Sequence, residues 1–149
     1  MAAPKGNTFW KNVKETTGRP LAFESPEELW EKAKEYFQWC DDNPLKEEKL
    51  FHYQGTITRD TASKMRAYTM RELCLFLGVN EVYFNQFNEE KHQEFSKIIT
   101  RIRDTIYTQK FTGAAADLLN PNIIARELGL SDNRNLNVNM EQPLFPDID

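Results

Sequence analysis

The sequence predicts a mainly α-helical subunit with one β-hairpin, and three observations carry this prediction. A long amphipathic pattern runs over residues 89–119, two short segments begin with helix-capping residues, and a glycine turn separates stretches rich in β-branched and aromatic residues. We divide the 149 residues into a basic N-terminal arm, 1–23, a helical core, 24–130, and an acidic tail, 131–149, whose composition predicts disorder. The core is large enough to bury an apolar interior of its own.

The first helix of the core is predicted from Ser25 to about Asp42. Ser25 is a good N-cap, Pro26 suits the first helical position, and Glu28 completes a capping box. Asn43 and the proline after it end the helix. Apolar residues at helical spacing predict its buried face, which comprises Leu29, Trp30, Ala33, Tyr36, Phe37 and Cys40.

A hairpin is predicted at about residues 46–59. Two apolar and aromatic stretches flank Gln54 and Gly55, a pair suited to a tight turn. An isolated hairpin is marginally stable in water, so it must lie on helices or join the hairpins of neighbouring subunits. We expect the following residues to form a loop that contains Lys64 and Arg66.

Two short helices joined by a tight turn are predicted next, which is a helix-turn-helix-like unit. Thr69 caps the first helix, Gly78 breaks it, and Asn80 caps the second. In a DNA reader, Asn85 and Gln86 are of the types that pair with adenine edges. The second helix has no Arg or Lys, however, and such a unit is also a common way to pack helices.

One long helix is predicted over residues 89–119, and the other segments are expected to pack against it. At about 45 Å it would exceed the width of a domain of this size, so part of it is expected to pack against another copy of the chain. Small residues near its end would allow close approach, although Gly113 could equally mark a bend. The candidate oligomerisation residues are Ile99, Ile102, Ile106, Gly113, Ala114 and Ala115.

Past this helix, Asn120 and Pro121 interrupt the pattern, and a last helical turn or two ends at Gly129. In the tail, Leu144 and Phe145 lie between prolines in an acidic setting. This is the form of a short docking peptide for a partner protein, although many such tails bind nothing specific.

Charge is unevenly distributed in a chain whose formal net charge is −4. The arm has a single acidic residue, whereas the tail from Leu130 onward has four acidic residues and one basic residue. The arm either contacts a phosphate backbone or an acidic partner, or it only aids solubility. The basic residues of the arm are Lys5, Lys11, Lys14 and Arg19.

Signals for catalysis, cofactors and metals are missing from the sequence. It has no phosphate-binding glycine loop and no arrangement typical of a nucleophilic triad. His52 and His92 lack further ligands at metal spacing, and Cys40 and Cys74 are interpreted as reduced thiols of a cytosolic protein. No apolar run has the length of a membrane span. We therefore expect a binding and assembly protein, not an enzyme.

Several short motifs, in order along the chain, resemble the small terminase subunits of tailed phages, in particular the short-tailed, headful-packaging phages of enteric bacteria. They span positions 1 to about 130, and none of them is catalytic. The motifs are MAAPKGN at 1–7, FESPE at 23–27, YQG at 53–55, KMRA at 64–67, FTGAAADLLN at 111–120, NIIAR at 122–126 and LGL at 128–130.

The resemblance implies a helical subunit with a hairpin that assembles into a homo-oligomeric ring of about eight to ten copies. Such a protein recognises the packaging site on double-stranded viral DNA and recruits and regulates the large terminase subunit, which carries the ATPase and nuclease. It works in the host cytoplasm and is not a component of the mature virion. The C-terminal tail commonly holds the large subunit.

The acidic tail departs from close relatives, in which a basic tail also binds DNA. Positive charge for DNA would then come first from the arm and second from Lys64 and Arg66. Two other functions stay open: a small helix-turn-helix transcription regulator that binds a palindromic site as a dimer, and a ring-forming protein adaptor that never binds DNA.

Overall fold

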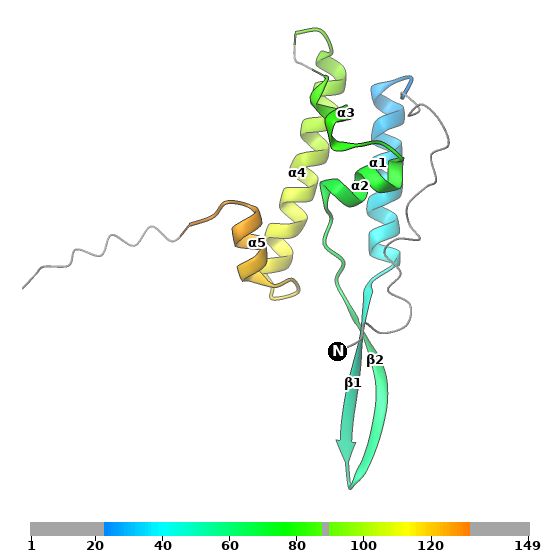
Figure 1. Cartoon of the computed structure of the whole chain (residues 1–149), viewed down its shortest axis with the longest axis vertical. Coiled ribbons are helices and arrows are strands. Elements are labelled where there is room, and N and C mark those ends of the chain that lie inside the picture. The colour runs from blue at the N-terminus through cyan, green and yellow to red at the C-terminus, as the bar shows by residue number, and fades with distance from the viewer. Residues whose placement is uncertain (1–22, 88–89, 132–149) are drawn as a thin grey trace, which may run out of the picture.

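A computed structural model describes residues 23–87 and 90–131. Helices α1 (Pro26–Asp42) and α4 (Gln93–Ala115) lie side by side, and the short helices α2 (Met70–Leu77) and α3 (Glu81–Asn85) pack across them (Figure 1). The strands β1 (Leu45–Tyr53) and β2 (Thr56–Lys64) form a hairpin that projects from one end of the helices, and α5 (Pro121–Glu127) folds back along the end of α4 (Figure 1). The predicted mainly helical fold with one hairpin is confirmed.

The capping residues begin their helices as predicted. The side chains of Ser25, Thr69 and Asn80 accept hydrogen bonds from backbone amides in the first turns of α1, α2 and α3. Gly78 ends α2 with a left-handed φ of 73°, which a glycine adopts without steric cost. Asn120 caps α5, so the interruption and the short last helix are also confirmed.

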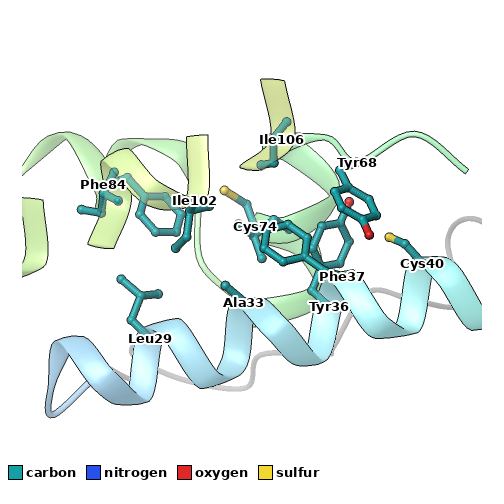
Figure 2. Packing of buried hydrophobic residues seen from close by; sticks show 12 residues of the cluster. Leu29, Ala33, Tyr36, Phe37, Cys40, Tyr68, Cys74, Phe84, Ile102 and Ile106 are labelled. Atoms are coloured by element: carbon teal, nitrogen blue, oxygen red, sulfur yellow. The ribbon is translucent and has the colours of Figure 1, made fainter. Parts of the chain in front are cut away.

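The core lies between α1 and α4 and is closed by α2 and α3. Figure 2 shows side chains of α1 reaching toward those of the other three helices. Rings pack closely at its centre, where Phe37 stacks on Tyr68 with 4.7 Å between their centroids. Its buried residues are Leu29, Ala33, Tyr36, Phe37, Cys40, Tyr68, Leu73, Cys74, Phe84, Ile99, Ile102 and Ile106.

The hairpin is longer than predicted. Its strands pair in antiparallel register from Leu45 with Lys64 to Tyr53 with Thr56. The two-residue turn has φ of 46° at Gln54 and 79° at Gly55, the left-handed pair that matches the twist of the strands. Lys64 therefore ends a strand and does not lie in a loop. The prediction missed this extension because residues 60–64 are small or polar and mostly exposed, so they lack the alternation of apolar and polar residues that indicates a strand.

The long helix is shorter than predicted. It spans 23 residues, Gln93–Ala115, and its length is about 35 Å. Beyond Ala115 the chain turns back, and the amides of Leu118 and Leu119 both donate to the carbonyl of Gly113. A helix of this length no longer requires a second subunit to pack against. Gly113 lies within α4, two residues before its end, so the helix continues through it and the chain turns only after Ala115.

Candidate functional site

Lys64 lies at the root of the hairpin and is accessible. Its Nζ is 3.0 Å from Oε2 of Glu47 on the neighbouring strand; the side chain of Lys64 is 57% exposed, and that of Glu47 is half-buried. The hydrogen bond from Lys64 is the main reason that the pKa of Glu47 lies below its usual value. This ion pair leaves Lys64 at the surface, where a DNA phosphate can approach it.

Arg66 has a different setting, because it is folded into the helical body. Only 10% of its side chain is exposed. Its guanidinium donates to Oε1 of Glu72 at 3.1 Å and to the carbonyl of Asn43 at 2.8 Å, and lies over the ring of Trp39. Its own carbonyl accepts from the side chain of Gln109. Arg66 thus ties α1, α2 and α4 together beneath the hairpin, and only a small part of its side chain is left open to a DNA phosphate.

Glu72 is the hub of this polar cluster. Its second carboxylate oxygen accepts from the hydroxyl of Tyr36 at 3.1 Å, and that hydroxyl in turn accepts from the amide of Thr69 at 3.1 Å. Burial raises the pKa of Tyr36 above its usual value. The buried thiol of Cys40 lies beside the same carboxylate, and burial raises its pKa to about 12. The cluster holds the fold together and leaves no activated nucleophile.

Asn85 and Gln86 are both exposed at the end of α3, where Phe84 anchors the helix in the core. The helix has only five residues, a short support for reading bases. A guanidinium nitrogen of Arg103, on α4, lies 3.5 Å from the Oδ1 of Asn85. This places a positive charge at the end of a helix that has none of its own.

Arg71 is, after Arg103, a second exposed cation that was not among the predicted site residues. It lies in the first turn of α2 with 90% of its side chain exposed, and its Nε is 4.0 Å from a carboxylate oxygen of Glu81 on α3. Neither Arg71 nor Arg103 stood out in the sequence, because their neighbours come from other helices. Arg71 thus lies near the first residue of α3, and Arg103 lies near the last one.

Three of the candidate oligomerisation residues are already buried within the chain. Ile99, Ile102 and Ile106 are buried in the core, on the helix that packs against α1. Gly113 is buried as well, and a Cβ at this position would lie 2.8 Å from Cδ1 of Leu119 and 3.1 Å from the sulfur of Met65. Ala115 is exposed and Ala114 is half-buried. An interface with another copy would therefore use residues of α4 other than the isoleucines.

Exposed apolar residues occur at two places that such an interface could use. Four lie on the hairpin: Leu50, Phe51, Tyr53 and Ile57. Others lie near the end of α4 and around α5, where Tyr107 and Phe111 stack with nearly parallel rings. Further exposed residues of this second group are Leu118, Ile123 and Leu130.

The remaining predicted site residues lie outside the described part of the chain. These are the DNA-binding candidates Lys5, Lys11, Lys14 and Arg19 and the docking pair Leu144 and Phe145. Within residues 23–87 and 90–131, no group of three or more His, Cys, Asp or Glu side chains could hold a metal ion. No helix among these residues is long and apolar enough to cross a bilayer.

Comparison with known proteins agrees with the resemblance noted in the sequence. A family model described as DNA-packaging protein gp3 matches residues 18–136, which include every helix and strand described above. The chain is also 48% identical to the terminase small subunit of Salmonella phage P22 over 132 residues, 89% of this chain and 80% of that protein. The chain belongs to the family of phage terminase small subunits, the gp3 DNA-packaging proteins.

Membership of this family gives the surfaces above a context. The matched region contains the hairpin, the α2–α3 unit and α5, but only the last residues of the basic arm.

Proposed function

We propose that this protein recognises double-stranded viral DNA at the packaging site and recruits and regulates the large terminase subunit in the host cytoplasm. The observation that carries the proposal is the family match over residues 18–136, supported by the identity with the P22 protein over most of both chains. On this proposal the protein holds the DNA and its partner, and the large subunit does the chemistry.

The DNA contact rests on cations from two regions. The basic arm supplies Lys5, Lys11, Lys14 and Arg19, and the helical body adds Arg71, which lies beside Glu81, and Arg103, which lies beside Asn85. Phosphate contacts by Lys and Arg give affinity, whereas amide side chains near the DNA can add base preference. The outer face of α1 is a poor candidate, because this helix has six acidic residues and two basic ones.

Assembly into a ring would multiply these contacts. Each copy brings one basic arm, so a ring of about eight to ten copies presents many weak phosphate contacts at once. The exposed apolar residues of the hairpin and of the α4–α5 end favour association, since a monomer would leave them in water. On this proposal Leu144 and Phe145 of the acidic tail dock on the large subunit.

Three measurements on the full chain test the proposal. Native mass spectrometry should give a mass near eight to ten times that of the 17.5 kDa subunit. Binding at low salt should be tighter for packaging-site DNA than for unrelated DNA of equal length. Deletion of residues 142–149 should abolish capture of the large subunit without changing DNA affinity. A dimer with a two-fold footprint would instead favour the transcription regulator, and a ring without DNA affinity would favour the protein adaptor.

A further inference from the structure

The hairpin has two chemically different faces. Residues that pair across the strands share a face, and neighbours along a strand point to opposite faces. The register pairs Phe51 with Thr58 and Tyr53 with Thr56 on one face, which we name the aromatic face. On the other, the aliphatic face, Leu50 pairs with Arg59 and His52 with Ile57.

Within residues 23–87 and 90–131, nothing covers either face in the distal half of the hairpin. The relative exposures of its four large apolar residues are 51% for Phe51, 61% for Ile57, 64% for Leu50 and 75% for Tyr53. The hairpin points away from the helices, so none of the five described helices lies on either face there (Figure 1). A two-stranded hairpin that exposes apolar side chains on both faces is marginal in water, and it needs a cover on each side.

Symmetric assemblies differ in whether they cover one face of the hairpin or both. In a two-fold dimer both subunits use the same surface, so one face of each hairpin would be covered and the other would stay in water. In a head-to-tail arrangement each subunit presents one face to the preceding copy and the other to the next copy, and both faces are buried. Of these two arrangements, only the head-to-tail one covers both faces of the hairpin.

We propose that the aromatic face of one hairpin packs on the aliphatic face of the hairpin of the next copy of this chain. This inference rests on the self-assembly in the proposed function and adds which surfaces meet and in which order. The rings of Phe51 and Tyr53 would lie against Leu50 and Ile57 of the neighbour, as the inner faces of two packed sheets do.

Charges nearer the hairpin root are compatible with this stacking. The aromatic face continues into two acidic and two basic residues, and the aliphatic face continues into Lys46, Glu48 and Arg59. Glu48 and Arg59 already form an ion pair at 3.5 Å. Because each face mixes both signs and neither has a block of like charges, stacked hairpins would not repel one another.

Two variants that each disable one face test the order of packing. Phe51→Asp places a charge on the aromatic face and Ile57→Asp places one on the aliphatic face. Each variant alone should fall to the mass of one chain, and an equimolar mixture should form a complex of two chains through the two intact faces. Ser63→Asp, opposite Lys46 at the hairpin root, is the matched control and should keep the wild-type mass. Circular dichroism should show wild-type helix content in all three, since the substituted side chains lie outside the helical core.

The outcomes separate this inference from the proposed function. A monomeric wild-type protein would overturn both. A multimeric wild type whose single variants keep its mass would overturn only the hairpin inference. So would single variants that each form dimers by themselves, because that is the result for packing of like on like.

A second test cross-links the hairpins by disulfide bonds, and its readout does not depend on the assembly coming apart. The cysteines of the chain, Cys40 and Cys74, are both buried, so new cysteines on the hairpin can be oxidised selectively. The double variant Phe51→Cys/Ile57→Cys should give a ladder of linked chains on a non-reducing gel, whereas either single variant should give no dimers. Dimers from a single variant, or no ladder from the double variant, would contradict head-to-tail stacking.

Discussion

Leu119 folds back over Gly113, so that a Cβ on the glycine would lie 2.8 Å from the leucine Cδ1. A larger side chain here would push the turn between α4 and α5 away from the helix and would also meet Met65, which precedes Arg66. We expect Gly113→Val to lower the free energy of unfolding by about 1–3 kcal/mol. Gly113→Ala should change it less, because the better helix propensity of alanine, worth about 1 kcal/mol, offsets part of the clash. Urea unfolding followed by circular dichroism measures both.

Ala115→Val is the matched control, since Ala115 ends the same helix and is exposed. It should change stability by less than about 0.5 kcal/mol. If Gly113→Val keeps wild-type stability but does not assemble, the glycine lies at a subunit interface and its packing within the chain is secondary.

Arg66 is expected to matter for stability and not for DNA. Arg66→Ala removes the guanidinium from Glu72 and from the carbonyl of Asn43, and it leaves the half-buried carboxylate without its cation. We expect a loss of about 2 kcal/mol in the free energy of unfolding. Arg59→Ala breaks an exposed pair with Glu48 and should cost less than about 1 kcal/mol. DNA affinity per assembled ring should be unchanged for Arg66→Ala, and a fall in affinity at unchanged stability would restore Arg66 as a DNA contact.

Local signals in the sequence predicted much of the fold. Ser25, Thr69 and Asn80 act on amides a few residues away, and Gly78 acts through its own φ, so neighbours along the chain are enough to reveal them. The predicted C-terminal end of α4 was wrong. The chain turns back after Ala115 and Leu119 packs on Gly113, although the helical pattern of the sequence continues.

The candidate site was predicted less well, because its contacts join residues far apart in the sequence. Arg66 looked like a loop cation, yet its partners Asn43 and Gln109 are 23 and 43 residues away. Arg103 is 18 residues from Asn85 and was not among the predicted site residues. Composition and spacing contain no signal for such pairs, which exist only once the helices are packed.

Lys110 holds α5 against α4 from a buried position. Only 5% of its side chain is exposed, and its ammonium donates to Oε1 of Glu127. Glu127→Gln would leave a buried cation without its carboxylate and should destabilise the protein by about 1–3 kcal/mol. The double variant Lys110→Met/Glu127→Gln should recover part of this loss, since the buried charge is removed as well. A double-mutant cycle by thermal unfolding measures the coupling, and zero coupling would mean that the pair does not hold α5 in place.

The two thiols and two tyrosines make the protein sensitive to alkali. Burial raises the pKa of Cys40 to about 12 and that of Cys74 to about 11, from 9.0, and it raises the pKa of Tyr36 and Tyr68 as well. Above pH 9 these thiols ionise in the unfolded chain while they stay neutral in the folded one, so the unfolded state gains stability as the pH rises. Their contribution is therefore complete below pH 9 and is lost toward pH 12.

We expect the melting temperature to fall steadily as the pH rises from about 9 toward about 11, and to fall less steeply in Cys40→Ala. Both thiols should resist Ellman's reagent in the native protein at about pH 8 and react on unfolding. Rapid reaction of either thiol in the native state would show that it is more accessible than the structure has it.

Lys11 and Lys14 test whether the basic arm binds DNA. The double variant Lys11→Ala/Lys14→Ala should weaken binding to double-stranded DNA, and the plot of log K against log salt should become shallower by about 0.9 for each phosphate that the variant no longer neutralises. The native mass should not change. Lys32→Ala/Lys34→Ala is the matched control, because it removes the same charge from α1, where each lysine is already paired with a glutamate of the same helix. Its binding curve should follow that of the wild type. Equal affinity and equal salt dependence for both double variants would move the DNA-binding surface from the arm to the region around α3, where Arg71 and Arg103 would be substituted next.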